Sequence, residues 1–546
     1  MTIFIGGAWP YTNGSLHLGH LASLLPGDIL ARYYRLKGEQ VLYVSGSDCH
    51  GTPIALRAKE ENVEAKEIAD NYHREFKDSF EKLGFTYDLY MRTDDSFHHQ
   101  KVKEFFNELY QNEYIYEKKV EQLYCSECDQ YLADRYVLGR CPECGEPTRG
   151  DQCESCSAMI EAAELKDKKC KICGSGAEVK ETEHFYLALS ELESKIEKVL
   201  QKRDVWRDNA VKLTEKYLAE GLKDRAVSRN LDWGIKVPLK NYSQKKIYVW
   251  VEAVLGYLTA SQKWALENNA DWKEFWQEES KSYYIHGKDN IPFHTIILPS
   301  LLAAQGNLNL PQNIVSSEYL TIEGRKLSTS KNWAVWVKDY LKNYNPDSIR
   351  YYLTVNGPEK RDSNFSWEEF INNHNGELLA AFGNFVNRTL VFIEKYFAGK
   401  IPDAEIDPVI ADKLKSIYSK TGERIENTEF KEALENIFSL IRDLNKYFDQ
   451  KEPWLSRKDN QVKCRETIYS CTAAIANLRN LLQPFLPFST VKVTEILNLE
   501  AADWNYLKLK AGREINESEI LFERIDKKQI EIEREKLKAK SKAKVD

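Results

Sequence analysis

Residues 2–48 read TIFIGGAWPYTNGSLHLGHLASLLPGDILARYYRLKGEQVLYVSGSD, and this stretch decides the fold class. It holds two short β-prone runs, Thr2–Ile5 and Val41–Val44. Between them the loop Pro10–Gly14 leads into a segment whose leucines recur at helical spacing, with Ser15 as the expected N-cap. Strand, loop, helix and strand in this order predict the opening of a doubly wound α/β sheet with parallel, Rossmann-like strands.

The rest of the chain predicts a return to this sheet and then a change of class. Strands are expected at Lys246–Trp250, Tyr283–His286 and Ile314–Leu320, each near a helical segment. Later, long apolar stretches at helical spacing, such as Glu377–Tyr396 and Ala473–Leu482, come with few strand signals. We therefore expect an all-α helix bundle after the sheet.

Composition bounds the kind of protein. The chain has 546 residues, of which 42% are hydrophobic and 29% charged, which is typical of a folded protein of two to four domains. No apolar run reaches the ~18 residues of a membrane helix, and no basic leader precedes the first strand, so we expect a cytoplasmic protein. The net charge of −7 excludes a general polyanion binder. The basic C-terminal residues 523–546 are expected to be a solvated tail, with RNA contact as the alternative.

Cysteine spacing predicts a metal module. Eight of the eleven cysteines form Cys-x-x-Cys pairs, each of which can present two thiolates to one tetrahedral zinc ion. Disulfides or redox pairs are the alternatives, and a reducing compartment and the absence of a thioredoxin-like setting disfavour them. The spacing leaves three ways to combine the pairs into two sites. The pairs are Cys125/Cys128, Cys141/Cys144, Cys153/Cys156 and Cys170/Cys173.

The segment His17-Leu18-Gly19-His20 opens the first predicted helix. Its two imidazoles are three residues apart and share a face, beside a helix N-terminus that favours anions. Gly19 leaves room for a flat base to approach the backbone. The segment is therefore a candidate phosphate-binding site, and a surface histidine pair or a weak metal site is the alternative.

A second candidate phosphate-binding segment runs from Gly324 to Lys331. It places three cations and three hydroxyls in one short loop after a predicted strand, a composition that can clamp pyrophosphate as charge develops on it. A solvated basic turn is the alternative. The pairing with His17 and His20 across a parallel sheet favours the nucleotide interpretation.

These two segments resemble the two signatures of class I aminoacyl-tRNA synthetases. Further motifs resemble the methionyl-tRNA synthetase family, in the same order and over nearly the whole chain. They are Ala8–Gly14, Asp48–Pro53, the four cysteine pairs, Tyr248–Trp250, Gly287–Asp289 with Phe293-His294, and Gly383–Arg388.

The resemblance implies roles for residues at an ATP site. His17 and His20 would stabilise the α-phosphate in the transition state, with Gly19 against the adenine. Asp289 would hold the ribose, and Lys326 the pyrophosphate of Mg²⁺-bound ATP. Thr329 stands where the family signature usually has a second lysine, and we assign it to the ATP site.

The resemblance also implies a methionine pocket. Asp48 would pair with the α-ammonium group of the amino acid, which fits a carboxylate at the carboxyl end of a strand. The thioether side chain would lie among Tyr11, Trp250, Tyr257 and His294. Aromatic walls suit a polarizable sulfur atom.

The resemblance also implies which cysteine pairs share a zinc site and which residues bind RNA. It implies that the two middle cysteine pairs form one site and the outer pairs a second, for one or two structural zinc ions per chain. In the bundle it places Asn384, Arg388 and Trp454 at the CAU anticodon of tRNA, where bases stack on aromatic or guanidinium planes.

The expected activity is ATP-dependent ligation of methionine to initiator and elongator tRNA(Met), by a monomer because the chain ends before any C-terminal tRNA-binding barrel. Alternatives are a class I synthetase for another amino acid, a non-catalytic RNA-binding paralogue, or a zinc-dependent nucleic-acid binder. The expected domains are a catalytic domain in two halves (1–118 and 226–316), an inserted zinc-knuckle domain (119–225), a stem-contact region (317–375), an α-helical anticodon-binding domain (376–522) and a basic peptide (523–546).

Overall fold

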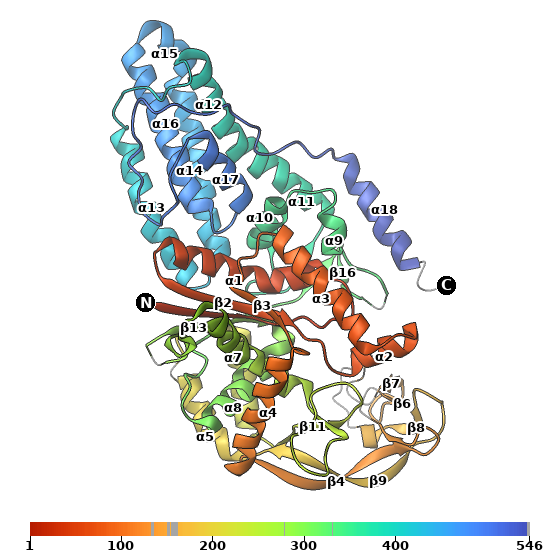
Figure 1. The fold of residues 1–546 in the computed structure, drawn as a ribbon. Helices are drawn as coiled ribbons and strands as arrows, with labels where there is room; N and C mark the ends of the chain where they lie inside the picture. The colour runs from red at the N-terminus through yellow and green to blue at the C-terminus, as the bar shows by residue number, and fades with distance from the viewer. Residues whose placement is uncertain are drawn as a thin grey trace.

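The computed structural model describes residues 1–132, 136–149, 153, 162–201, 203–277, 279–329 and 331–542. Figure 1 shows three regions: a helix bundle at the top, a sheet flanked by helices in the middle, and a cysteine-containing module at the lower right. No helix among the described residues is long and apolar enough to cross a membrane.

The central sheet confirms the predicted parallel, doubly wound class. Its five strands lie in the order β14-β13-β1-β2-β3, and every neighbouring pair is parallel. The sheet has two halves, β1 to β3 and β13 to β14. The first strand of each half lies inside the sheet, and the later strands are added outward on both sides. The strands are β1 (Thr2–Gly7), β2 (Gln40–Ser47), β3 (Leu89–Arg92), β13 (Lys281–Gly287) and β14 (Asn313–Ser317).

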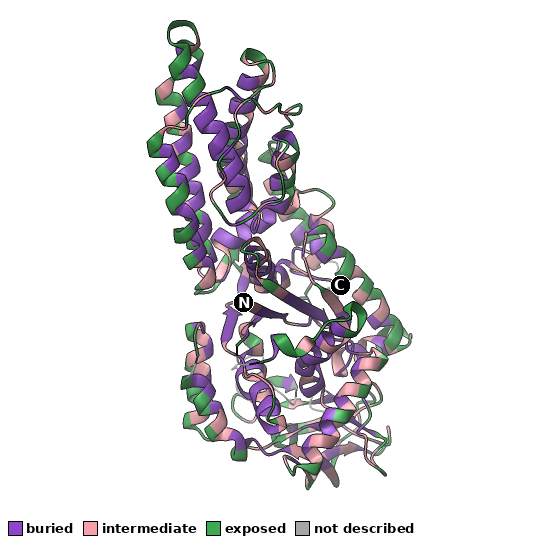
Figure 2. Cartoon of the chain, turned by 60° about the vertical axis from the view of Figure 1, so that its left-hand side comes forward, coloured by how far each residue is buried: buried purple, intermediate pink, exposed green. Residues whose placement is uncertain are grey.

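Alternate side chains of these strands enter two different cores. Ile3 and Ile5 pack with α1 (Leu18–Leu36) and the bundle, whereas Phe4 packs with α7 (Val249–Asn268) and α8 (Leu298–Gln305). Both faces of the sheet are therefore buried, as a parallel sheet requires. Figure 2 shows the strands as a buried band through the middle of the molecule.

The N-terminus of α1 differs from the prediction. His17, not Ser15, is the N-cap: its side chain accepts a hydrogen bond from the His20 amide, and the His20 side chain accepts one from the His17 amide. The Ser15 prediction is wrong because a reciprocal imidazole pair satisfies the first free amides of the helix two residues later.

Two predicted strands also differ. Lys246–Trp250 is strand only in β12 (Lys245–Ile247), which pairs with β11 (Ser228–Asn230) outside the central sheet, because Tyr248 already caps α7. The run Ile314–Leu320 divides into β14 and β15 (Leu320–Ile322). β15 belongs to a separate small sheet with β16 (Arg325–Lys326) and β17 (Ser363–Phe365).

The cysteine module is reached through a long antiparallel ribbon of β4 (Ile115–Cys125) and β9 (Glu178–Leu187). The module contains β5 (Gln130–Tyr131) and a sheet of β6 (Val137–Arg140), β7 (Pro147–Arg149) and β8 (Lys166–Cys170). The chain then forms α5 (Leu189–Gln201), α6 (Asp208–Ala219) and β10 (Arg225–Ala226), and α5 packs on α8 in the core of the central sheet.

Helices cover the remaining surface. Around the central sheet lie α2 (Thr52–Glu61), α3 (Ala65–Lys82) and α4 (Ser96–Gln111), and α9 (Val337–Tyr340), α10 (Pro346–Asn356) and α11 (Trp367–Asn373) lead to the bundle.

The bundle itself confirms the predicted all-α class. It consists of a π-helical segment at His374–Gly383, α12 (Asn384–Tyr396), α13 (Pro408–Glu426), α14 (Phe430–Lys451), α15 (Pro453–Asp459), α16 (Gln461–Leu482) and α17 (Pro487–Ile496).

The C-terminal segment is a docked helix, α18 (Lys528–Lys542), so the expectation of a solvated tail is wrong for these residues. Leu537 is buried against the body, Arg534 Nε lies 3.0 Å from a Glu323 carboxylate oxygen, and Lys540 Nζ lies 2.6 Å from one of Asp339. Figure 1 shows α18 beside α9 and α11. Arg534 and Lys540 therefore pair with acids of the same chain.

Candidate functional site

The histidine pair forms one rigid unit at the start of α1. The two imidazole rings are stacked, with their centroids 3.7 Å apart and an angle of 16° between their planes. Each Nδ1 accepts a backbone N–H of the other residue, at 3.2 and 3.3 Å. Because both Nδ1 atoms are acceptors, a neutral ring carries its proton on Nε2. Two Nε2–H donors are thus fixed at the N-terminus of a helix.

The surroundings keep both rings neutral. Burial lowers the pKa of His20 to about 4, and burial and then the charge of His20 lower the pKa of His17 well below its ordinary value. At neutral pH the pair therefore consists of uncharged hydrogen-bond donors, which suit an oxyanion whose charge develops during a reaction.

The second predicted segment, Gly324–Lys331, is called the lysine-serine loop below, and its residue Leu327 lies near Gly19 of the histidine segment. Lys326 is exposed at the end of β16, and a Cβ placed on Gly19 would lie 3.4 Å from Leu327 Cδ1. Further on, the Leu18 amide donates to the Val335 carbonyl at 3.1 Å, so the chain after the loop runs along the start of α1. Thr329 lies in the turn of this loop, where its carbonyl accepts from the Asn332 amide. Ser330 lies outside the described residues.

Asp48 follows β2 at the same carboxyl edge of the sheet. Tyr11 and Asp48 form a parallel β-bridge, and the Asp48 carboxylate accepts the His50 amide at 3.1 Å. Burial, and then the nearby charge of Glu252, raise the pKa of Asp48 well above its ordinary value. A buried carboxylate of this kind is a site for a cation that can replace its lost hydration.

The residues predicted to surround the thioether side chain form two groups of contacts. Tyr11 contacts Trp250 edge to face, with ring centroids 5.5 Å apart, and Trp250 stacks on Phe293 at 4.0 Å. The Tyr257 hydroxyl donates to His294 Nε2 at 2.7 Å, while His294 Nδ1 donates to the Asn290 carbonyl. Burial lowers the pKa of His294 to about 4, so this ring is a neutral acceptor.

Trp9 occupies space that two glycines leave free. A Cβ at Gly46 or at Gly256 would lie 2.6 or 2.7 Å from the Trp9 ring. The bulky Trp9 is thus accommodated between β2 and α7. Sequence alone did not pair these three positions because they are distant in the chain.

A buried polar network that sequence reasoning missed lies next to Asp48. His50 Nδ1 is 2.9 Å from both carboxylate oxygens of Glu252, and both side chains are buried. His98 Nε2 is 3.8 Å from Glu252, and its Nδ1 bonds to Thr259 at 2.8 Å. The available signal was a single carboxylate in the first turn of the otherwise apolar start of α7.

Asp289 lies at the carboxyl end of β13, in the short 3₁₀ turn Lys288–Asn290. Its carboxylate accepts a hydrogen bond from the Tyr319 hydroxyl, and Lys288 Nζ lies 3.8 Å from the centroid of the Tyr319 ring. Tyr319 was not predicted. Asp289 is thus exposed at the edge that also carries Asp48, and its carboxylate is oriented by a phenol.

The cysteines gather into two groups. Ligand atoms of Cys125, Cys128, Cys170 and Cys173 all lie within 4.8 Å of one another, and so do those of Cys141, Cys144 and Cys153. Sγ–Sγ distances of 3.4, 3.9 and 3.6 Å are close to the edge of about 3.8 Å in a tetrahedral Zn–thiolate site. Both groups can hold a metal ion. Cys156 lies outside the described residues.

The residues predicted at the anticodon lie on α12 and α15, and Figure 1 shows α15 at the outer end of the bundle, far from the sheet. Arg388 packs 4.5 Å over the Phe448 ring and pairs with Asp449 at 2.9 Å. Trp454 is 41% exposed and contacts the same Phe448 at 6.1 Å between centroids. Asn384 is exposed one turn before Arg388 on α12. Trp454 and Asn384 thus present exposed aromatic and amide surfaces, whereas Arg388 is half-buried, with its Nε and Nη2 atoms inaccessible to solvent.

Comparison with known families agrees with both regions. Residues 3–390 match the model described as tRNA synthetases class I (M), and residues 399–542 match the anticodon binding domain of methionyl tRNA ligase. The chain is 59% identical over 540 residues to the methionine–tRNA ligase of Bacillus mycoides (strain KBAB4), which covers 98% of this chain and 99% of that protein. The methionine–tRNA ligase of Bacillus cereus (strain B4264) is 58% identical over the same length.

Solved structures share the fold. The Mycobacterium tuberculosis methionyl-tRNA synthetase bound by methionyl-adenylate superimposes with a TM-score of 0.80 at 22% identity, over 96% of this chain and all of that one. A second structure of that enzyme in complex with methionyl-adenylate gives a TM-score of 0.81. The chain therefore belongs to the methionyl-tRNA synthetase family of class I aminoacyl-tRNA synthetases.

Proposed function

We propose that this chain activates methionine with Mg·ATP and transfers it to initiator and elongator tRNA(Met). In the first step a carboxylate oxygen of methionine attacks the α-phosphorus, the bond to the β-phosphate breaks, and pyrophosphate leaves. In the second, a hydroxyl of the terminal ribose of tRNA attacks the carbonyl carbon of methionyl-adenylate, and AMP leaves as the hydroxyl proton is lost.

The proposed first step depends on electrostatic stabilisation. The fixed Nε2–H groups of His17 and His20 donate to the α-phosphate oxygens, and Gly19 lies against the adenine. Lys326 neutralises the pyrophosphate as it leaves, and Thr329 supplies a hydroxyl from the same loop. Phosphoryl displacement needs positioning and charge stabilisation more than covalent help.

In the proposed substrate pocket Asp48 holds the α-ammonium group and Asp289 the ATP ribose. Tyr11, Trp250, Tyr257 and His294 surround the thioether side chain. His294 is neutral, and it orients the Tyr257 hydroxyl. Both groups add polarity to the pocket but no charge, which suits an uncharged sulfur atom.

Asn384, Arg388 and Trp454 are proposed to bind the CAU anticodon. The two cysteine groups are proposed to hold structural zinc, which when bound cross-links a module whose own hydrophobic core is small. We also propose a cytoplasmic monomer with the domain limits expected from the sequence: 1–118 and 226–316, 119–225, 317–375, 376–522 and 523–546.

The observation that carries the proposal is the approach of Leu327, in the lysine-serine loop, to Gly19 between the two histidines, at the sheet edge that also bears Asp48. Methionine-dependent exchange of radioactive pyrophosphate into ATP tests it, with cysteine, valine, isoleucine and leucine as controls. Exchange with methionine alone is expected. Exchange with another amino acid, or none with a folded protein, would overturn the proposal.

A further inference from the structure

We propose that Glu252 is a positioning residue of the amino-acid pocket, which acts through His50 to fix the carboxylate of Asp48. This inference rests on the proposed function, because it assumes that Asp48 binds the α-ammonium group. It adds a second buried carboxylate, more than 200 positions away in the sequence, to the machinery that recognises the amino acid.

The geometry is a short chain of hydrogen bonds. Both oxygens of Glu252 lie 2.9 Å from His50 Nδ1, so this nitrogen carries a proton and donates it to the carboxylate. The backbone N–H of the same His50 donates to Asp48 Oδ1 at 3.1 Å. The ring anchor thus sets where the His50 amide lies, and the amide sets the rotamer of Asp48.

Glu252 also joins two elements that carry pocket residues. It lies in the first turn of α7, two residues after Trp250 and five before Tyr257, whereas His50 follows β2. A bond between them therefore holds the ammonium-binding carboxylate in register with the aromatic residues on α7. A shift of Asp48 relative to these aromatic residues would be costly, because a bound substrate must be held close to its productive geometry.

Burial makes the network more than a packing contact. Glu252 and His98 are 0% exposed and His50 only 2%, and a charged carboxylate in such a place needs partners. The titratable groups that face the pair formed by Glu252 and His50 are Asp48 after β2, Asp94 before α4, and His98 and His99 on α4. Two neighbouring carboxylates give this pocket a negative potential, and the ammonium group of an amino acid fits that potential.

The test separates positioning of Asp48 from general support of the fold. Binding of methionine and of 4-(methylthio)butanoate, which is methionine without its amino group, is measured by calorimetry for the natural chain and for Glu252→Gln. The amide keeps the size and one acceptor but removes the charge. Methionine is expected to bind about tenfold more weakly or worse, and the des-amino analogue to change less than about twofold. Glu252→Asp, which keeps the charge, should recover part of the loss.

Matched controls define the outcomes. Glu267→Gln, at an exposed carboxylate on the same helix, should change neither affinity. In an Asp48→Asn background, Glu252→Gln should have no further effect on methionine. Equal weakening of both ligands by Glu252→Gln would overturn the inference, whereas failure of the natural chain to bind methionine would contradict the proposed function instead.

A second variant keeps the test decisive if Glu252→Gln does not fold. His50→Gln breaks the same chain from its other end, and circular dichroism establishes whether it is folded. The same selective loss of methionine affinity is expected. A folded His50→Gln protein with natural affinity for methionine would also overturn the inference.

Discussion

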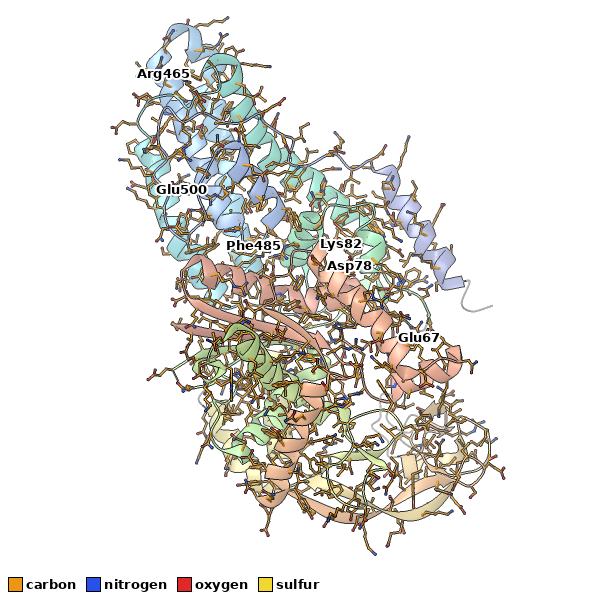
Figure 3. All side chains as sticks on the ribbon, in the orientation of Figure 1. Glu67, Asp78, Lys82, Arg465, Phe485 and Glu500 are labelled. Carbon is orange, nitrogen blue, oxygen red and sulfur yellow. The ribbon has the colours of Figure 1, made fainter. Side chains whose placement is uncertain are left out.

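Arg350 Nη2 lies 2.7 Å from Asp28 Oδ2, and neither side chain is exposed to solvent. Asp28 belongs to α1, the helix that begins at the histidine pair, and Arg350 to α10. Arg350 also donates to the carbonyls of Pro484 and Phe485 at the base of the bundle, at 2.9 Å each. Figure 3 labels Phe485 at this junction. One buried guanidinium therefore connects α1, which carries the histidine pair, with the helix bundle.

Replacing Arg350 by methionine should destabilise the protein strongly. Burial raises the pKa of Asp28, but Arg32 and Arg350 lower it by more, so its pKa lies below the ordinary value. Without Arg350 this buried carboxylate keeps the charge of Arg32 and two hydrogen bonds from Thr86, and loss of a buried partner costs about 3 to 5 kcal/mol. We expect about 3 kcal/mol, since Arg32 still pairs, measured from the urea midpoint.

The control is an exposed ion pair of α3. Lys82 Nζ lies 2.9 Å from Asp78, and both side chains are about 60% exposed. Lys82→Met should change the free energy of unfolding by less than about 0.5 kcal/mol. If both variants were equally stable, the Arg350 junction would have no special role.

The histidine pair gives a kinetic prediction. His20→Ala removes one of the two Nε2–H donors proposed for the α-phosphate, a change that costs about 10²- to 10³-fold in rate when such a donor is lost. Methionine binding should change far less, because His20 is proposed to contact the α-phosphate and is not among the residues proposed to bind methionine. Pyrophosphate exchange and calorimetric methionine binding measure the two quantities. Normal exchange in the variant would discard the assignment.

The pH dependence should separate Asp48 from the histidines. In the proposed pocket Asp48 binds the ammonium group in its charged form, and its pKa is raised, so the KM for methionine should rise as pH falls at values above the usual range of an aspartate. The kcat at saturating methionine should show no titration near 6.5, because the pKa of His20 is about 4 and that of His17 is also low. A kcat that follows a group near 6.5 would mean that the pair acts as a charged acid.

Short-range patterns in the sequence were sufficient to predict part of the fold and of the site. Patterns among residues within a few positions of one another mark the individual strands of the sheet, the helices of the bundle, the histidine pair and the cysteine pairs. Contacts across long separations were not predictable: His50 with Glu252, Asp289 with Tyr319, and Trp9 with Gly46 and Gly256. Such partners are fixed by the order of the strands, which no local spacing encodes. The Ser15 error has a local origin instead, because the preference of serine for N-caps was overridden by two imidazoles, three residues apart, that bond to each other's backbone.

The cysteine groups predict a metal stoichiometry. Cys170→Ser should remove one zinc ion per chain and leave the other, since Cys170 belongs only to the group with Cys125, Cys128 and Cys173. Plasma mass spectrometry of the purified protein measures this. Cys471→Ser, at a buried cysteine of the bundle, is the control and should leave the zinc content unchanged. Loss of both ions from Cys170→Ser would show that the groups are not independent.

Trp454 allows the RNA step to be tested apart from the chemistry. Its ring is 41% exposed at the outer end of the bundle and rests against Phe448, which also supports Arg388, so truncation removes a stacking surface without opening the core. Loss of one stacked base costs about 1 to 3 kcal/mol, so Trp454→Ala should raise the KM for tRNA about 10- to 100-fold. Pyrophosphate exchange without tRNA should remain at the natural rate, because the sheet edge is remote from this end. Leu455→Ala, at the neighbouring exposed residue, is the matched control for aminoacylation. Equal losses in exchange and aminoacylation would mean that Trp454 supports the fold and does not read the anticodon.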